Sequence, residues 1–248
     1  MKRLIVFLPN AITLLNLITG SIAIVLAIEG NLGYAGLAIL VGGLFDFLDG
    51  FTARLLKSYS DIGKQLDSLA DVVTFGVAPG IIAFILMKRA LPGLNLPLVD
   101  LSPSFWQGIF LLFPFLIPAF SAYRLAKFNL DERQSVNFLG MPTPANAILW
   151  ASFGIISEFT THPEIPVLLF TARNLLFTIV VTSLLLVSEL PMFSLKFNGL
   201  DLVTNWYRYV FLLVSLLLLI FLNILGLPII ILLYIALSVS FYIFKINL

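Results

Sequence analysis

The sequence predicts an all-α integral membrane protein, built as a bundle of about eight transmembrane helices. Of its 248 residues, 60% are hydrophobic and 11% are charged, and the mean hydropathy is +1.08. A soluble domain carries about a quarter charged residues, so this chain has too little polar surface to fold in water. In addition, apolar stretches of membrane-spanning length alternate with short segments that are polar or contain Pro and Gly.

The predicted spans follow one another along the whole chain. The length of each is close to that of a membrane-spanning helix, which has about 20 apolar residues. They are residues 11–28, 33–56, 65–87, 105–126, 144–159, 170–188, 207–225 and 227–245. The first span is expected to be retained and not cleaved as a signal peptide. Pro9 and Asn10 interrupt its apolar run, and no small-x-small cleavage site follows.

Basic residues predict the orientation. With eight spans, both termini lie on the same side as the segments after spans two, four and six. That side collects Lys2, Arg3, Arg54, Lys57, Lys64, Arg124, Lys127, Arg133, Lys196, Arg208 and Lys245. The opposite side has Lys88 and Arg89, with Arg173 at its border. Because basic residues favour the cytoplasmic side, we expect both termini in the cytoplasm and the protein in the cell (inner) membrane.

Composition also excludes several classes of function. The chain has no cysteine, which excludes disulfides, thiolate nucleophiles and zinc–sulfur sites. The one histidine, His162, lies in a polar stretch and is expected to be a solvated loop residue. A net charge of +1 offers no broad basic face, so nucleic acid is not expected as a partner.

Spans two and three carry four aspartates on faces that are predicted to meet. Asp46 and Asp49 are three residues apart, and Asp67 and Asp71 are four apart, so each pair lies on one helix face. A short polar turn folds the two helices antiparallel and brings the pairs together at the cytoplasmic side. Small residues on the same faces let the backbones approach and leave room for a ligand: Gly42, Gly50, Ala53 and Gly63.

Four carboxylates in this position indicate a metal site. A charged aspartate at mid-bilayer costs about 2.5–3.5 kcal/mol, so a cluster is stable where it lines a polar cavity and shares cations. Ligands that are all oxygen favour Mg²⁺ or Mn²⁺, and four carboxylates are enough to bridge two ions. The alternative is a structural polar cluster, satisfied by neighbours such as Arg54 or Lys64.

The spacing of these residues resembles a known family. The pattern Asp46-x2-Asp49-Gly50-x2-Ala53-Arg54-x8-Gly63-x3-Asp67-x3-Asp71 is similar, without a gap, to the signature of CDP-alcohol phosphatidyltransferases. The resemblance implies that all four aspartates are metal ligands and that Asp71 is also the catalytic base. It implies that Gly50, Ala53 and Gly63 lie beside the CDP group, that Arg54 meets phosphate or braces the loop, and that the protein is a homodimer.

Further segments resemble the branch of this family that uses serine as acceptor: 8–20, 66–80, 124–129, 138–145 and 188–197. The resemblance implies transfer of the phosphatidyl group of CDP-diacylglycerol to L-serine, with release of CMP, by a membrane enzyme of phospholipid biosynthesis. It divides the chain into a transferase core, 1–190, and a C-terminal helix pair, 191–248. The branch often has arginine where this chain has Lys127.

Two sets of polar residues have open interpretations. Serine carries a carboxylate, so Arg124, with Asn129 as a hydrogen-bonding partner, is the candidate serine site; the alternative for Arg124 is anchoring at the cytoplasmic surface. Asn10, Thr13 and Asn16 either cap the first span or contact cytidine and ribose of the CDP-lipid.

Other acceptors and another class of function remain alternatives. Glycerol 3-phosphate, inositol phosphate, or serine with an archaeal-type lipid would keep the same chemistry. A divalent-cation transporter would also use intramembrane aspartates, but residues 77–87 carry almost nothing polar to continue a conduction path. A transferase of the phospholipase-D type is excluded, because it needs two histidines.

Overall fold

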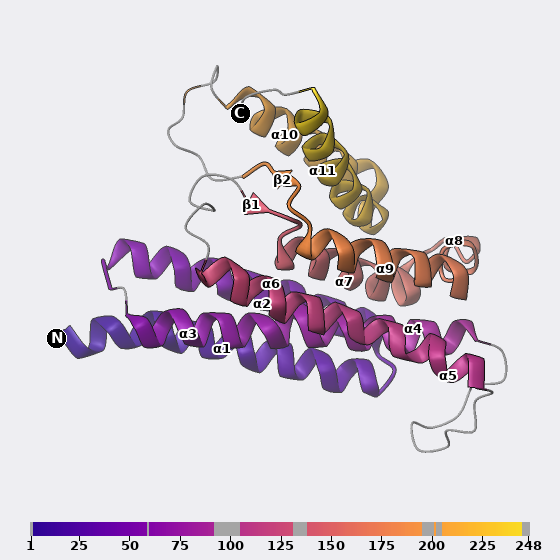
Figure 1. The fold of residues 1–248 in the computed structure, drawn as a ribbon, viewed down its shortest axis with the longest axis horizontal. Coiled ribbons are helices and arrows are strands. Elements are labelled where there is room, and N and C mark those ends of the chain that lie inside the picture. Colours follow the sequence, from indigo (N-terminus) through magenta and orange to yellow (C-terminus); the bar gives the residue numbers. More distant parts are fainter. Residues whose placement is uncertain are drawn as a thin grey trace.

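The structure is a computed structural model that describes residues 2–58, 60–91, 105–130, 138–194, 201 and 205–244. These residues form a predominantly helical fold (Figure 1). Its elements are α1 (Lys2–Ile28), α2 (Leu32–Leu55), α3 (Asp61–Asp71), η1 (Val72–Val77), α4 (Ala78–Ala90), α5 (Phe105–Leu112), η2 (Phe113–Phe115), α6 (Leu116–Leu130), β1 (Phe138–Leu139), α7 (Thr143–Phe159), α8 (Glu164–Leu169), α9 (Ala172–Val187), β2 (Pro191–Met192), α10 (Trp206–Leu222), η4 (Asn223–Leu225) and α11 (Gly226–Ile243).

The prediction of an all-α membrane protein is confirmed, and each predicted span coincides with helical structure. Five helical stretches among the described residues are long and apolar enough to cross a membrane: Phe7–Ile28, Leu32–Leu55, Asp61–Ala90, Gln107–Leu130 and Trp206–Ile243. The last stretch contains two of the predicted spans, since the chain turns at η4 between α10 and α11, where Asn223 has φ 50°. The other two predicted spans are α7, with 17 residues, and α9, with 16 residues.

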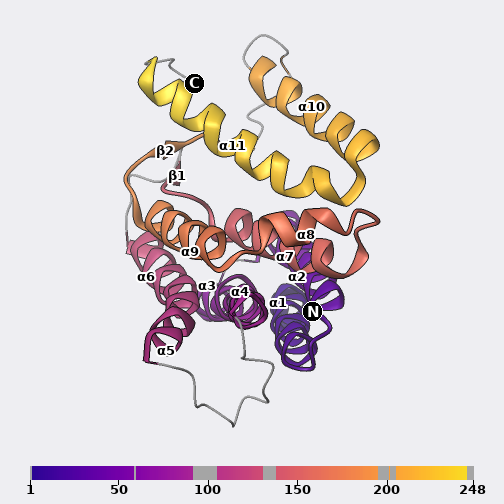
Figure 2. The ribbon, with the colours of Figure 1, turned by 90° about the vertical axis from the view of Figure 1, so that its right-hand side faces the viewer.

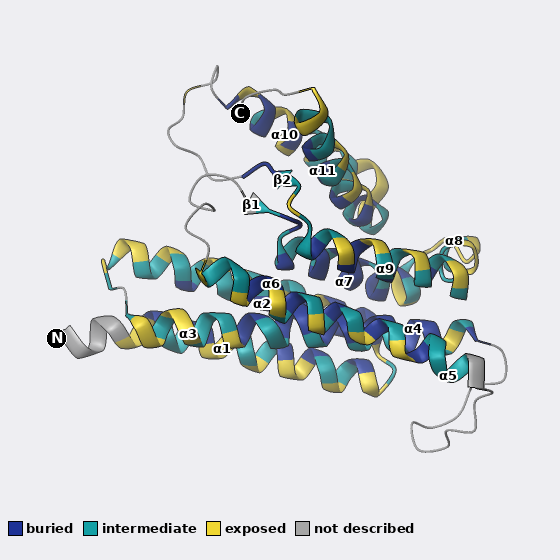
Figure 3. Cartoon of the chain, viewed as in Figure 1, coloured by how far each residue is buried: buried dark blue, intermediate teal, exposed yellow. Residues whose placement is uncertain are grey.

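The outer surface of the bundle is apolar, as contact with lipid requires. Large hydrophobic side chains such as Ile22, Phe47 and Leu213 are about half exposed or more. Figure 3 shows such exposed positions along the outer helices, while buried residues gather where the helices meet. A soluble monomer rarely exposes so much contiguous apolar surface, because water disfavours it.

The helices are arranged in three layers. Figure 2 shows α10 and α11 on one side, α7 and α9 in the middle, and α1 to α4 on the other side. Close contact between α2 and α7 depends on glycine. A Cβ added to Gly154 would lie 2.5 Å from the backbone oxygen of Leu32, and one added to Gly36 would collide with the backbone oxygen of Ala151. The two backbones therefore pack directly against each other.

Two features of the helices differ from the sequence prediction: where α1 begins, and the presence of a short additional helix. The helix α1 begins at Lys2 and continues through Pro9, so Asn10 and Thr13 lie inside it; the interpretation of these two residues as helix caps is wrong. The short helix α8 was not predicted, since its six residues follow a proline-containing turn and bury none of their side chains.

The helix pair that carries the aspartates is joined by a tight polar turn. Ser60 caps α3, because its hydroxyl accepts a hydrogen bond from the N–H of Gly63 at 3.0 Å. From α3 the chain continues through the π-helical segment η1 into α4 without a break. Widened turns of this type occur often at functional sites, and η1 follows Asp71 directly.

The C-terminal half packs around an aromatic side chain. Phe193, which follows β2, contacts the rings of Tyr207, Phe211 and Tyr234 from α10 and α11. The two-residue pair β1–β2 and a hydrogen bond from Met141 N–H to the oxygen of Leu185 join the start of α7 to the end of α9. The division between 1–190 and 191–248 stays a prediction.

The N-terminal end of α2 is capped by a side chain from α7. Glu158 accepts hydrogen bonds from the N–H groups of Leu32, at 2.5 Å, and Gly33, at 2.8 Å, whereas the side chain of Asn31 makes no cap. A carboxylate at this position accepts from two N–H groups that have no partner within the helix, and the positive N-terminal end of the helix dipole stabilises its charge.

We expect Glu158→Ala to lower the free energy of unfolding by about 1–2 kcal/mol, because it leaves both N–H groups without this acceptor. Thermal unfolding in detergent measures the effect. The control is Glu164→Ala, which removes only an exposed contact with His162 and should change little. Equal melting temperatures for the two variants would show that solvent replaces the cap.

Candidate active site

Three of the four predicted carboxylates lie together between α2 and α3. One oxygen from each of Asp46, Asp49 and Asp67 lies within 4.8 Å of the others. Asp49 is buried, and the other two are partly exposed. The antiparallel packing of the two helices produces this cluster, since residues three or four apart share a helix face.

Asp71 lies one turn after Asp67 on α3 and is more buried than Asp67. It is 8% exposed, and its carboxylate accepts a hydrogen bond from Nδ2 of Asn16 on α1 at 3.3 Å. It lies outside the group of three, but it interacts electrostatically with Asp46 and Asp67. The four acidic groups thus form one electrostatic unit.

The cluster fits a divalent cation. Oδ2 of Asp49 is buried and has no hydrogen-bond partner among the described residues. A buried carboxylate oxygen without a partner is unfavourable unless a cation or a ligand satisfies it. The donors are all carboxylate oxygens, which suit Mg²⁺ or Mn²⁺.

A pocket of about 540 Å³ opens beside the carboxylates. Asp49 and Asp67 lie in its wall, and so do six residues that the sequence analysis singled out for CDP-lipid binding: Asn10, Thr13, Gly50, Ala53, Arg54 and Gly63. Outside its own stretch of helix, no atom of the described residues lies within 4 Å of where a Cβ on Gly50 would be, so this glycine faces open space. The pocket wall also contains Lys64, a cation that the sequence analysis used for orientation and as a possible partner of the aspartates, but not for CDP-lipid binding.

The two candidate serine-binding residues lie on α6, and neither belongs to the described wall of that pocket. Arg124 is 7% exposed, and its Nε has no hydrogen-bond partner among the described residues. Its guanidinium interacts electrostatically with Asp71 and with Tyr234 of α11. Asn129 instead braces α6 against α3, because its Nδ2 donates to Oγ of Ser68 at 2.7 Å.

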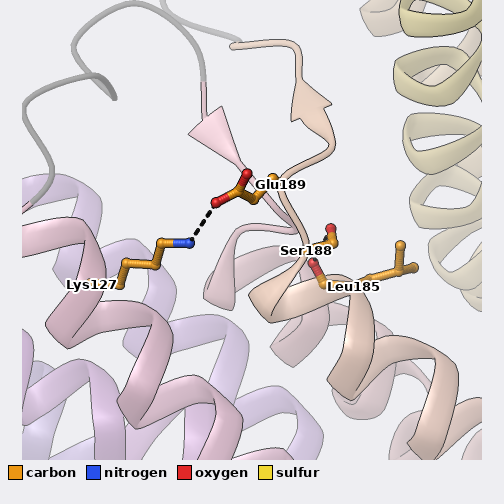
Figure 4. Close-up of polar contacts among 4 residues, drawn as sticks. All are labelled: Lys127, Leu185, Ser188 and Glu189. Carbon is orange, nitrogen blue, oxygen red and sulfur yellow. Dashed lines mark hydrogen bonds and ion pairs between the residues drawn. The ribbon is translucent and has the colours of Figure 1, made fainter.

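Lys127 does not point into the carboxylate cluster but joins α6 to the segment after α9. Figure 4 shows its ammonium directed at Glu189, and the distance from Nζ to Oε1 is 3.3 Å. Ser188, beside Glu189, donates a hydrogen bond from Oγ to the oxygen of Leu185 at 2.9 Å and so ends α9. This ion pair is partly exposed, and its role is to connect two elements.

Two interactions near the site were not predicted. Asn16, which the sequence analysis linked either to capping or to the CDP-lipid, contacts Asp71 directly, and Tyr234 comes from the helix pair to which the sequence analysis assigned no role. Elsewhere in the bundle, other buried side chains also have polar atoms without partners among the described residues, among them Ser121, Asn146 and Ser183. Isolated polar residues in apolar helices give no sequence signal of which ones converge.

The comparison with known proteins decides the family. A family model described as CDP-alcohol phosphatidyltransferase matches residues 6–244, which is nearly the whole chain. The chain belongs to the CDP-alcohol phosphatidyltransferase family. It is therefore a membrane-embedded transferase, as the resemblance of the Asp46–Asp71 segment predicted.

Individual relatives of this CDP-alcohol phosphatidyltransferase have more specific names. It is 35% identical over 157 residues to a CDP-diacylglycerol–serine O-phosphatidyltransferase from Bacillus subtilis, a match that covers 63% of this chain and 78% of that protein. It is 35% identical over 158 residues to an archaetidylserine synthase from Methanothermobacter thermautotrophicus, covering 62% of this chain and 61% of that protein. A CDP-diacylglycerol–serine O-phosphatidyltransferase from Methanocaldococcus jannaschii is 34% identical over 151 residues, a match that covers 61% of this chain and 62% of that protein.

We expect Asp49→Asn to weaken Mn²⁺ binding about 10-fold or more, because it removes charge from a buried oxygen that has no hydrogen-bond partner among the described residues. Electron paramagnetic resonance of free Mn²⁺ measures the affinity of the purified protein in detergent. Glu29→Gln, at an exposed position between α1 and α2, is the matched control and should bind as the unchanged protein does. Equal affinities for both variants would remove Asp49 from the metal site.

Proposed function

We propose that this transferase moves the phosphatidyl group of CDP-diacylglycerol to the hydroxyl of L-serine, giving phosphatidylserine and CMP. The observation that carries the proposal is the cluster of Asp46, Asp49 and Asp67, since Asp49 and Asp67 lie in the wall of a pocket that is also lined by the small residues of the family signature. The names of the Bacillus and Methanocaldococcus relatives support serine as the acceptor.

Asp46, Asp49, Asp67 and Asp71 would hold the divalent cations, Mg²⁺ or Mn²⁺, and we propose two ions. When bound, such cations neutralise the charge of the diphosphate and make CMP a better leaving group. The nucleotide would enter the pocket beside Gly50, where the open space suits close approach of a ligand to the helix. Arg54 and Lys64, from the two sides of the turn, are suited to phosphate oxygens.

Asp71 is proposed as the base. Its carboxylate accepts the proton of the serine hydroxyl as the serine oxygen attacks the phosphorus that carries diacylglycerol. The new bond joins serine oxygen to this phosphorus, and the bond from the same phosphorus to the oxygen of CMP breaks. The Asn16 amide, at 3.3 Å, keeps the carboxylate oriented.

The acceptor would approach from the side of α6. Its carboxylate needs a cation next to the base, and Arg124 is buried, incompletely hydrogen-bonded and in electrostatic contact with Asp71. A guanidinium binds a carboxylate through two parallel hydrogen bonds. Asn129 fixes the end of α6 against α3 in this scheme, and so supports Arg124 indirectly.

The remaining parts of the proposal concern location and assembly. We propose that the enzyme lies in the cell (inner) membrane with both termini and the active site in the cytoplasm, and that it forms a homodimer. The basic residues of the α2–α3 turn support this orientation, since they lie at the same end of the bundle as the N-terminus (Figure 1). Arg133, Lys196 and Lys245 of the same predicted side lie outside the described residues.

The decisive experiment measures CMP release by the purified protein with CDP-diacylglycerol and Mn²⁺. We expect release that requires L-serine and stops when the metal is chelated. Glycerol 3-phosphate and inositol phosphate are tested beside serine, and a CDP-activated archaeal ether lipid beside CDP-diacylglycerol, since one relative is an archaetidylserine synthase. Release with another acceptor in place of serine would refute serine transfer. Divalent-cation flux in proteoliposomes without CMP release would favour a transporter.

Asp71→Asn should lower turnover by about 10³-fold, because an amide cannot accept the proton of the serine hydroxyl. Binding of CDP should persist, since Asp46, Asp49 and Asp67 remain in the pocket region. Single-turnover rates and equilibrium binding of CDP separate the two effects. Normal turnover in this variant would exclude Asp71 as the base.

Arg124→Ala should raise the KM for serine about 10-fold or more, since a hydrogen bond between charged groups contributes about 1.5–3 kcal/mol. The KM for CDP-diacylglycerol should change far less, because Arg124 lies outside the nucleotide pocket. Lys127→Ala is the control from the same helix and should leave the serine KM nearly unchanged. Equal increases in both KM values for Arg124→Ala would contradict the assignment.

A further inference from the structure

Asn16 on α1 contacts the carboxylate cluster from outside the two helices that carry the aspartates. Its Nδ2 donates to Oδ1 of Asp71 at 3.3 Å, and the side chain is completely buried. Its own Oδ1 has no hydrogen-bond partner among the described residues. The contact with Asp71 is therefore the interaction that sets the orientation of this amide.

The backbone of Asn16 is held by the segment that carries Asp71. The hydroxyl of Thr74, three residues after Asp71, donates to the backbone oxygen of Asn16 at 3.0 Å. The hydroxyl of Thr19 donates to the same oxygen at 2.8 Å. Asp71 ends α3 and Thr74 belongs to the π-helical segment η1 that continues it, so α1 is joined to this continuous helix twice, at Asp71 and one turn beyond it.

Two glycines allow α1, α2 and η1 to meet at Thr74. A Cβ added to Gly20 of α1 would lie 2.8 Å from Cα of Thr74, and one added to Gly42 of α2 would lie 2.6 Å from Cγ2 of Thr74. Atoms of Thr19 and Asn16 lie 3.0 and 3.1 Å from the same point on Gly42. The space around Thr74 thus has no room for another methyl group.

This crossing of α1, α2 and η1 lies about one helical turn from the carboxylate cluster and from Asn16, measured along each helix. Gly42 precedes Asp46 by four residues, Thr74 follows Asp71 by three, and Gly20 follows Asn16 by four. We infer that Asn16 is a positioning residue for Asp71, and that the contact of Gly20, Gly42 and Thr74 sets the distance and rotation of the helices that carry the metal ligands. The inference deepens the proposed function and rests on it for the role of Asp71.

The test compares Gly42→Ala with Gly43→Ala in the full-length protein. Both changes raise helix propensity by roughly 1 kcal/mol, so neither weakens α2 itself. Only at Gly42 does the new methyl enter the crossing, because a Cβ on Gly43 has its nearest neighbour, Cε1 of Phe75, at 3.7 Å. We expect Gly42→Ala to weaken Mn²⁺ binding and slow CMP release about 10-fold or more. Gly43→Ala should keep both within about twofold.

A second substitution separates positioning from loss of stability. Thr74→Ser keeps the hydroxyl that bonds Asn16 and removes Cγ2, the atom nearest the new methyl of Gly42→Ala. Combined with Gly42→Ala, it should restore most of the lost Mn²⁺ affinity and rate. General destabilisation would not be rescued in this way, because Thr74→Ser removes a further buried methyl group.

Three outcomes would overturn the inference. The first is equal Mn²⁺ affinity for Gly42→Ala and Gly43→Ala, and the second is failure of Thr74→Ser to rescue. If Gly42→Ala does not fold, Asn16→Ala replaces it: unchanged Mn²⁺ affinity and rate in that variant is the third. Absence of serine-dependent CMP release by the unchanged protein would refute the proposed function instead, and Mn²⁺ affinity would still test the crossing.

Discussion

The structure depends on keeping four acidic side chains close together inside membrane-spanning helices. Like charges repel, and each carboxylate is unfavourable in an apolar medium, so the cluster requires compensation that lipid cannot supply. Here the compensating groups include the Asn16 amide and the Arg124 guanidinium beside Asp71, and a pocket that reaches Asp49 and Asp67. One buried oxygen of Asp49 has no hydrogen-bond partner among the described residues, and a bound cation would satisfy it.

The helices can meet this requirement because they approach closely. Hydrophobic burial does not drive helices together within a bilayer, so packing of small residues takes its place. Glycines occur at the contact of α2 with α7 and at the contact of α2 with η1. Hydrogen bonds to backbone groups add to these contacts. Glu158 of α7 accepts from a backbone N–H of α2, and Thr74 of η1 donates to a backbone oxygen of α1. We therefore infer that catalytic geometry and stability depend on the same crossings.

The two substrates would reach the cluster from different sides. The nucleotide pocket is made by α1, α2 and the start of α3, which are the helices of the family signature and of the N-terminal segment. Arg124 belongs to α6, and Tyr234 of α11 lies close enough to interact with it. In the proposed scheme the signature helices would provide the chemistry shared by the family, while later helices would provide groups that distinguish acceptors. This division also gives the C-terminal helix pair a link to the site.

The sequence by itself determined the membrane class, the helical positions of all eight predicted spans and the aspartates of one signature, because composition and spacing along a helix are local properties. It also identified six residues of the pocket wall: the resemblance to the family signature implied Gly50, Ala53, Arg54 and Gly63, and Asn10 and Thr13 are polar residues at the start of the first span. Only the tertiary structure decided that Asn16 contacts Asp71, that Lys127 pairs with Glu189, and that Thr74 lies between two glycines. Each of these contacts joins residues that lie about 30 to 60 positions apart or belong to different helices. Periodicity specifies which face of a helix a residue occupies, but the rotation and partner of that face are set by packing.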